Sequence, residues 1–245
     1  TLFSKEYLNA KGTETIKKVF NVERSYFDYV KPIELMYDLM VMGGLDGDIV
    51  LDFFSGSSST AHSVLKFNAD FDSNNRFIMV QLPELLPETS EARKAGYNFI
   101  TDIAKSRIIE SSKYIKQETE AEIDYGFRVY QLDESNMQDV YYKPQDYKQE
   151  AMDLFADNVK PDRTADDLLA QVMLDWGLPL SLKIEQIKIA GKQVFKVAEN
   201  SLYACFDKGI DEAFAKAIAK DVPLRIVFRD NGFTNDTAKT NVKQL

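Results

Sequence analysis

A hydrophobic strand that runs directly into a turn of small residues, at residues 49–62, constrains the fold most. Apolar residues precede Asp52, and residues 55–59 are all Ser or Gly, so the backbone can turn sharply and approach a ligand closely. A helical sequence follows from Ala61, with Ser and Thr side chains available to cap its first turn. This order predicts an α/β protein with a ligand-binding loop at the end of a strand.

The turn differs from the two common phosphate-binding loops. A Walker-type loop needs Lys and then Ser or Thr after its last Gly, and a dinucleotide loop needs three glycines in register. Residues 55–60 contain a single glycine, Gly56, and no Lys. The sequence therefore disfavours a triphosphate or dinucleotide site, and an ordinary strand-to-helix connection remains the alternative to a ligand-binding loop.

Composition indicates a globular protein in a reducing, cytoplasmic setting. Of the 245 residues, 44% are hydrophobic and 28% charged, and no apolar run approaches the length that spans a bilayer. The start of the chain has no secretory pattern. With one cysteine, Cys205, and one histidine, His62, the chain can form neither an internal disulfide framework nor a Cys/His metal cluster.

The charge distribution argues against a broad nucleic-acid surface. The net charge is −9, of which residues 1–116 carry −2 and residues 117–245 carry −7. Because DNA affinity comes mainly from neutralising phosphates with Lys and Arg, a contact with DNA must be local or must lie on another chain.

Hydrophobic patterns predict an alternating first half. A helix begins at Pro32, and an uninterrupted apolar run at residues 76–82 is typical of a parallel strand covered on both faces. Residues 90–116 are helical with an interruption near Gly96. Together with the strand and helix at 49–68, these elements predict a right-handed parallel βαβα unit.

The second half has a different character. A strand is predicted at 127–132, a polar loop at 141–150, and helices at 147–158 and 164–176, the last ending in a core anchor, Trp176. Further along the chain we expect a hairpin at 184–197, a strand at 202–206, a helix at 212–220, a strand at 224–228 and a polar end. This half is α+β.

Five motifs in a fixed order carry a family resemblance. They are Phe27-x-x-x-Lys31-Pro32, the loop from Asp52 to Thr60, residues 77–84 (FIMVQLPE), residues 126–136 (GFRVYQLDESN) and residues 227–233 (VFRDNGF). In this order the chain resembles the carboxy-terminal half of a Type III restriction-modification methylation subunit. The resemblance implies an incomplete Rossmann-like methyltransferase sheet at 1–116, which binds S-adenosylmethionine, and an α+β carboxy-terminal domain at 117–245.

The resemblance also implies that part of the active site lies elsewhere. These subunits are adenine-specific DNA methyltransferases in which an Asp-Pro-Pro-Tyr type motif precedes the cofactor loop, so that motif is expected upstream of residue 1. Residues 1–245 contain no Pro-Pro pair. The motif binds the amino group of a flipped adenine. We therefore expect no catalytic residue in this chain and no methylation by this polypeptide alone.

Specific roles follow for the cofactor side. Phe54 and the backbone around Gly56 are expected to contact the methionine part of the cofactor, and Lys31 its carboxylate, unless Lys31 is simply solvated. Asp52 either binds the ammonium group or caps the loop, and Gln81 stands where many methyltransferases place an acidic residue for the ribose. The full set of predicted cofactor-binding residues is Lys31, Pro32, Asp52, Phe53, Phe54, Ser55, Gly56, Ser58, Thr60, Gln81 and Glu84.

Partners and alternatives follow from the same resemblance. It implies contact with DNA through the complete enzyme, a homodimer formed by the carboxy-terminal domain, and a helicase-like restriction subunit, with no membrane partner. A competing interpretation is a non-catalytic interaction module that lost cofactor binding, which Ser58 in place of Gly and Gln81 in place of an acid favour. A small-molecule methyltransferase is disfavoured by the motif order and by the carboxy-terminal half.

Overall fold

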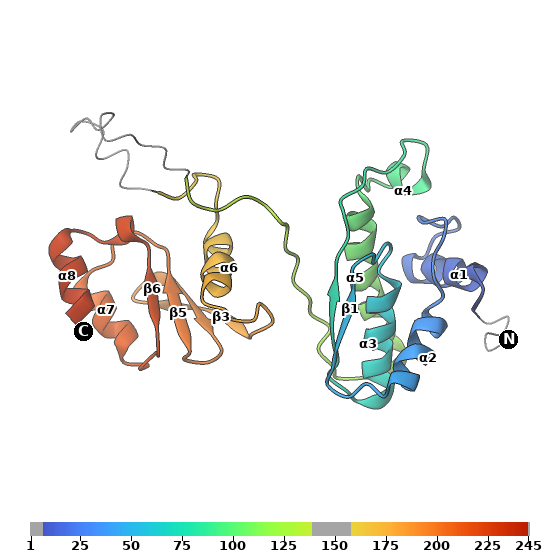
Figure 1. Ribbon diagram of the computed structural model, residues 1–245, viewed down its shortest axis with the longest axis horizontal. Coiled ribbons are helices and arrows are strands. Elements are labelled where there is room, and N and C mark those ends of the chain that lie inside the picture. Colours follow the sequence, from blue (N-terminus) through green and yellow to red (C-terminus); the bar gives the residue numbers. More distant parts are fainter. Residues whose placement is uncertain (1–6, 139–157, 245) are drawn as a thin grey trace. The chain divides into compact units, whose positions relative to one another are not determined.

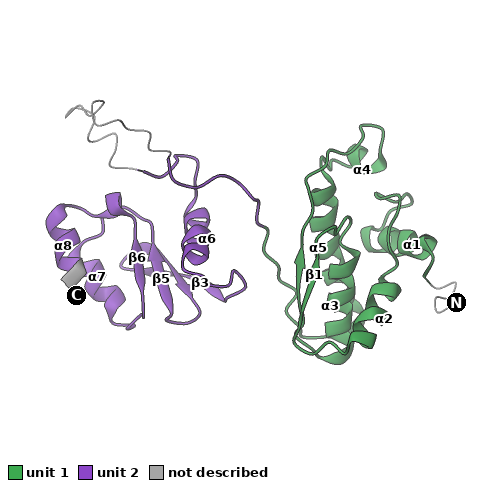
Figure 2. Cartoon of the chain, in the orientation of Figure 1, with its two compact units in different colours: residues 1–129 green, residues 130–245 purple. Residues whose placement is uncertain are grey.

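The computed structural model describes residues 7–138 and 158–244, and the chain divides into two compact units. Residues 1–129 form unit 1 and residues 130–245 form unit 2 (Figure 2). Unit 1 extends to residue 129, beyond the boundary at residue 116 that the change in composition suggested. The predicted helix at 147–158 falls almost wholly outside the described residues.

Unit 1 is a small parallel sheet with helices (Figure 1). Strands β1 (Ile49–Asp52) and β2 (Arg76–Met79) pair in parallel, with Leu51 opposite Ile78. Helix α3 (Ser59–Phe71) connects them, as the sequence predicted. The other helices are α1 (Asn9–Phe20), α2 (Ile33–Gly43), α4 (Glu91–Lys94) and α5 (Ile100–Thr119).

Local sequence sets the ends of these helices. Helix α2 begins at Ile33, one position later than predicted, so Pro32 is the residue directly before the helix. The ring of Pro32 fixes a backbone angle that suits a helix start. Gly44 ends α2 with a φ of 64°, in the left-handed region that glycine adopts without cost. Ser90 caps α4 by accepting a hydrogen bond from the backbone of Arg93 at 3.1 Å.

One face of the β1–β2 sheet is covered by helices. Ala61 and Leu65 of α3 pack with Ile108 and Ile115 of α5 in a buried cluster, against which Phe77 and Met79 of β2 lie. A neighbouring cluster joins α2 to α3 through the side chains of Met40, Val64 and Phe67.

The other face of this sheet is open, which corrects the expectation that residues 76–82 are covered on both faces. Successive side chains of a strand point to opposite faces, and every second residue of both strands is exposed. Leu51 is 57% exposed and Ile78, opposite it, 50%. In the part of the chain that the structure describes, this face has no helical cover. Its apolar residues are Ile49, Leu51, Ile78 and Val80, and we call them the open face.

The strand predicted at 127–132 is wrong. Residues 120–134 form no ladder in the described structure. Of the predicted range, Phe127 is half-buried and packs against the α3–α5 cluster, as do Ile123 and Tyr125 before it. Val129, Tyr130 and Leu132 are 61%, 49% and 101% exposed, so the apolar residues here do not mark a buried strand.

Unit 2 is built on a four-stranded sheet in the order β3-β4-β5-β6. The hairpin of β3 and β4 is antiparallel, β4 and β5 are antiparallel, and β5 and β6 are parallel. The predicted hairpin and strands are confirmed, whereas the polar end of the chain forms a helix that the sequence reading missed. The elements are α6 (Ala165–Asp175), β3 (Ile184–Ile189), β4 (Lys192–Val197), β5 (Leu202–Cys205), α7 (Glu212–Ala219), β6 (Ile226–Phe228), the 3-10 turn η4 (Asp230–Gly232) and α8 (Asp236–Gln244).

Both faces of this sheet are covered. Phe195 and Leu202 pack with Met173 of α6 on one face. Tyr203 packs with Phe214 of α7 on the other face. All four residues of β5 are buried, including Cys205, whose thiol pKa is raised by burial.

Trp176 is not the buried anchor that the sequence suggested. It lies directly after α6 and is 40% exposed, with the guanidinium of Arg225 stacked 5.1 Å from its ring centre. A helix end lies at the rim of the core, where a cation can cover an aromatic face.

Candidate functional site

The predicted loop starts at the carboxyl end of the parallel strand pair. The pairing of β1 and β2 continues one step beyond the strands, because the Val80 backbone N–H donates to the Asp52 carbonyl at 2.8 Å. The Ser55 N–H then donates to the Val80 carbonyl at 3.2 Å. Ligands of open α/β sheets bind at this edge.

Two residues of the turn have positive φ angles. Gly56 has φ 52° and Ser58 has φ 57°. The Ser58 N–H donates to the Ser55 carbonyl at 2.7 Å and closes the turn. The left-handed conformation explains why a glycine is usual at the second position, and Ser58 occupies it at a cost of about 1 kcal/mol. The ring of Phe27 lies close to Gly56, where an added Cβ would be 3.5 Å from Phe27 Cζ.

Asp52 holds the loop together with both carboxylate oxygens. Its Oδ1 accepts from the Phe54 N–H at 3.1 Å, and its Oδ2 accepts from the Thr60 hydroxyl at 2.6 Å. This is the loop-capping role that was the alternative to ammonium binding. Because each carboxylate oxygen has two acceptor positions, the group can still accept a further donor.

Gln81 also braces the loop. Its Oε1 accepts from the Gly56 N–H at 2.8 Å, and its Nε2 donates to the Leu82 carbonyl at 3.3 Å. Glu84 is exposed, and its carbonyl accepts from the Ile100 N–H at 2.9 Å at the start of α5. The predicted ribose contacts of both residues remain predictions.

The serines at the start of α3 do not cap the helix, contrary to expectation. The residue before α3, Ser58, makes no side-chain cap. The hydroxyl of Ser59 donates to the Lys31 carbonyl at 3.0 Å, and that of Ser63 donates to the Ile33 carbonyl at 3.0 Å. These bonds bring the Lys31–Pro32 segment, which is distant in sequence, against the loop. They also leave the N–H groups of the first turn of α3 without a side-chain partner.

Sequence reading missed Arg107, which supports the loop from α5. Its side chain is fully buried, and its Nη1 donates to the hydroxyls of Ser57 at 2.8 Å and Ser59 at 2.7 Å. Burial lowers the pKa of Arg107 to about 9. A signal was present, because Arg107 and Ser111 occupy the same four-residue repeat as the buried Ile103 and Ile115.

His62 is buried beside this network. It is 2% exposed, and its Nδ1 has no hydrogen-bond partner in the described structure. Burial, together with the positive charges of Arg107 and Lys66, lowers the pKa of His62 well below its usual value. His62 is therefore neutral at physiological pH, in agreement with a structural role.

The loop also presents aromatic surface. Phe53 is 61% exposed and Phe54 is 84% exposed, with their ring centres 5.1 Å apart. The loop thus combines exposed aromatic rings, the uncapped N–H groups at the start of α3 and the Asp52 carboxylate. Such a set of donors and acceptors suits a zwitterionic ligand with a flat apolar part.

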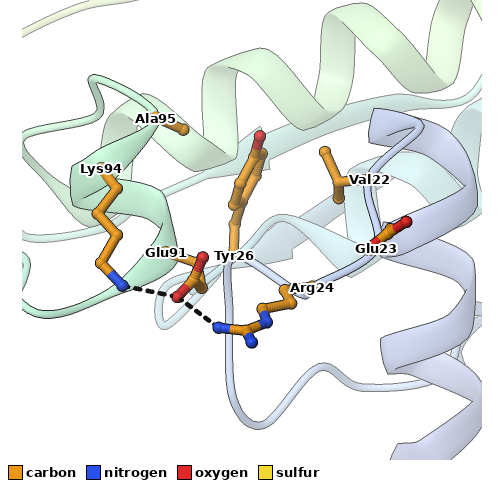
Figure 3. A pocket seen from close by; sticks show the side chains of 7 residues that line it. All are labelled: Val22, Glu23, Arg24, Tyr26, Glu91, Lys94 and Ala95. Atoms are coloured by element: carbon orange, nitrogen blue, oxygen red, sulfur yellow. Dashed lines mark hydrogen bonds and ion pairs between the residues drawn. The ribbon is translucent and has the colours of Figure 1, made fainter.

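Two cavities in the described part of unit 1 lie away from the predicted cofactor-binding residues. A cavity of about 530 Å³ lies between the segment after α1 and helix α4, where Glu91 pairs with both Arg24 and Lys94 (Figure 3). A smaller cavity of about 200 Å³ is lined by helices α1, α2, α3 and α5 and includes Glu34 and His62. None of the predicted cofactor-binding residues lines either cavity.

Two further properties concern only the described residues. No three His, Cys, Asp or Glu side chains among them gather closely enough to hold a metal ion. Within the same residues, every helix is too short or too polar to cross a membrane.

Comparison with known proteins finds similarity to DNA methylases. The DNA methylase family matches residues 3–123. The Type III restriction-modification enzyme EcoP15I Mod subunit of Escherichia coli is 33% identical over 232 residues, which are 91% of this chain and 34% of that protein. The EcoPI Mod subunit of Escherichia phage P1 is 32% identical over 127 residues, 52% of this chain and 19% of that protein.

A Type II relative matches a shorter region. The methyltransferase M.KpnI of Klebsiella pneumoniae is 26% identical over 102 residues, 42% of this chain and 24% of its own length. The chain thus spans about a third or less of the length of the curated relatives it matches.

Proposed function

Because this chain carries a DNA methylase domain at residues 3–123 and is related to the Mod subunits of Type III restriction-modification enzymes, we propose that it binds S-adenosylmethionine. It does so as the cofactor-binding part of a site-specific adenine DNA methyltransferase. S-adenosylmethionine supplies the methyl group from a sulfonium. The residues of this chain bind and orient it.

One observation carries the proposal. The turn at 55–58 lies at the carboxyl edge of the parallel strands, and the hydroxyl of Ser59, directly after the turn, donates to the Lys31 carbonyl at 3.0 Å. Two of the motifs that the resemblance implies for cofactor binding are thus joined by a hydrogen bond in one place.

The residues present fit the chemical groups of the cofactor. The uncapped start of α3 and the Lys31 ammonium suit the methionine carboxylate. Asp52 keeps acceptor capacity for the ammonium group. Phe53 and Phe54 offer exposed ring surface to the adenosine. Gln81 and Glu84 remain the candidates for the ribose hydroxyls.

Methyl transfer itself requires residues outside this sequence. Extraction of an adenine from the duplex exposes its amino group, which must be held by the Asp-Pro-Pro-Tyr type motif. Residues 1–245 contain no Pro-Pro pair. We propose that this polypeptide alone transfers no methyl group to DNA.

The proposed partners are those that the family resemblance implies. The carboxy-terminal domain forms a homodimer, and a helicase-like restriction subunit and DNA bind to the complete enzyme, which acts in the cytoplasm. The net charge of −7 over residues 117–245 suits contact with protein better than contact with phosphates.

Titration calorimetry of the full chain with S-adenosylhomocysteine tests cofactor binding. We expect measurable heat and a rise in the unfolding temperature. Phe54→Ala should weaken binding, because it removes ring surface proposed to contact the adenosine. The variant should stay folded, since Phe54 is 84% exposed and its loss costs little stability. Met42→Ala, which removes a 76% exposed side chain from α2, is the matched control and should bind as the wild type does.

Absence of heat and of a thermal shift at millimolar ligand would overturn cofactor binding. A second assay incubates the chain with labelled S-adenosylmethionine and adenine-containing duplex DNA. Incorporation of label by this polypeptide alone would overturn the claim that it is inactive.

A second candidate function is a non-catalytic interaction module. Ser58 in a left-handed position and the exposed apolar residues of the open face favour it. Under this function, S-adenosylhomocysteine produces no heat, and light scattering shows association of the chain with itself that weakens when Leu51 is replaced by Asp.

A further inference from the structure

The buried guanidinium of Arg107 is the feature that the proposed function does not yet explain. Arg107 is 0% exposed, and its Nε and Nη2 have no hydrogen-bond partner among the described residues. No described carboxylate forms an ion pair with it. A buried charge without a counter-charge is strongly unfavourable in a protein interior.

Among the described residues, the side chain of Arg107 donates hydrogen bonds only to the turn at residues 57–59. Its Nη1 donates to the hydroxyls of Ser57 and Ser59 at 2.8 and 2.7 Å and lies 3.4 Å from the Ser57 carbonyl oxygen. Hydroxyls are weak partners for a cation compared with a carboxylate. The geometry thus places a positive charge directly beneath residues 57–59, where α3 begins.

One other feature at this point favours a negative charge on the ligand. The first N–H groups of α3 carry the positive end of the helix dipole, and no side chain caps them. An anion at the turn would lie at this helix end, with the buried guanidinium behind Ser57 and Ser59.

We propose that Arg107 is a positioning and specificity residue: its buried charge makes the loop select ligands that carry the methionine carboxylate. The inference rests on the proposed cofactor binding and deepens it. Arg107 acts through Ser57 and Ser59 without touching the ligand. In the absence of ligand it holds the turn, and a bound carboxylate supplies its missing counter-charge.

A matched pair of ligands tests this. S-adenosylhomocysteine carries the carboxylate, and its carboxamide replaces that group with a neutral amide but keeps the ammonium and the adenosine. The full-length wild-type chain should bind S-adenosylhomocysteine at least about tenfold more tightly than the carboxamide, as removal of one charge interaction near a buried cation predicts.

Arg107→Gln removes the charge and keeps hydrogen-bonding capacity. We expect it to abolish most of the preference for the carboxylate, with circular dichroism used to select conditions in which the variant is folded. Lys105→Gln removes a charge from the exposed side of the same helix, where Lys105 pairs with Asp102 at 3.0 Å, and should leave the preference unchanged.

Arg107→Lys decides the question where Arg107→Gln does not fold. It keeps the charge and loses the planar fork, so the preference should stay within about threefold of the wild-type value. A folded Arg107→Lys without the preference, or a folded Arg107→Gln with the full preference, would overturn the inference and leave cofactor binding standing. A wild-type chain that binds neither ligand would overturn the proposed function, and the inference with it.

Discussion

The two sheets of this protein differ in how much of their apolar surface the described residues cover. Unit 2 has a four-stranded sheet with a buried cluster on each face. Unit 1 has two strands with helices on one face, and the open face exposes four large apolar side chains. Contiguous exposed apolar surface is typical of places where another molecule or segment binds.

Each unit contains one residue that can be followed separately by spectroscopy. Trp176 is the single tryptophan of the chain and belongs to unit 2, whereas His62 is the single histidine and belongs to unit 1. Tryptophan fluorescence and the imidazole signals in NMR spectra therefore follow the two units separately.

The largest expected effect is in the covered sheet. Phe195→Ala empties a site that is 1% exposed, and it should lower the free energy of unfolding of unit 2 by about 3–5 kcal/mol. Urea unfolding followed by Trp176 fluorescence measures this loss.

The matched control lies on the open face. Leu51→Ala should cost less than about 0.5 kcal/mol in unit 1, because Leu51 is 57% exposed. A loss above about 2 kcal/mol at Leu51 would mean that the open face is covered in solution, and the contrast between the two sheets would disappear.

A smaller loss is expected from overpacking in unit 1. A Cβ on Gly12 would lie 2.3 Å from the Val30 carbonyl oxygen, so α1 passes directly against the segment that leads to Lys31. Gly12→Ala should destabilise unit 1 by about 1–3 kcal/mol and weaken binding of S-adenosylhomocysteine. Thermal unfolding and calorimetry measure the two effects.

The neighbouring exposed residue provides the control for this change. Lys11→Ala should leave both quantities near their wild-type values. If Gly12→Ala proved as harmless as Lys11→Ala, then the close approach of α1 to Val30 would not exist in solution.

Acid should weaken unit 1 more than unit 2 through His62. The pKa of this imidazole is lowered well below its usual value in the folded protein, so the unfolded chain binds more protons below about pH 6.5. Stability rises with pH where the unfolded state holds more protons, so it should fall by about 1.4 kcal/mol from pH 7.5 to pH 5.5. Urea unfolding followed by the His62 signals checks this.

Two comparisons isolate the histidine. His62→Gln should lose most of this pH dependence, and unit 2 should keep its own behaviour when followed by Trp176. A wild-type imidazole that titrates near pH 6.5 in the folded protein would contradict the prediction.

The smallest effect concerns the loop. Ser58 has φ 57°, so Ser58→Gly should relieve backbone strain and stabilise unit 1 by up to about 1 kcal/mol. Ser55 has no positive φ, so Ser55→Gly should instead destabilise by roughly 0.5–1 kcal/mol. Thermal melts of the two variants should shift in opposite directions, and equal shifts would contradict the geometry of the turn.

Sequence patterns predicted the parts of the fold that local rules control. The strand, turn and helix at 49–71 and the hairpin around Gly191 follow from apolar periodicity and from turn chemistry, and the structure contains them. In the candidate site, residue types alone indicated a close-approach turn at Gly56, and the structure gives it a positive φ.

The remainder depends on tertiary contacts that no local pattern encodes. The apolar residues at 127–132 suggested a strand, but Phe127 packs against helices and Val129 and Leu132 are exposed, so the predicted strand was wrong. The role of Arg107 depends on Ser57, fifty positions away in sequence. The exposure of Leu51 and Ile78 also differs from expectation, because apolar composition does not say which faces are covered.

The attachment of residues 123–127 to the α3–α5 cluster determines where the chain can be divided. A protein cut after residue 116 would strip Ile123, Tyr125 and Phe127 from that cluster and leave a bare hydrophobic groove on the amino-terminal piece. Division after Val129 keeps these side chains in place. Separate expression of the two halves should therefore succeed at the later junction and yield aggregates at the earlier one.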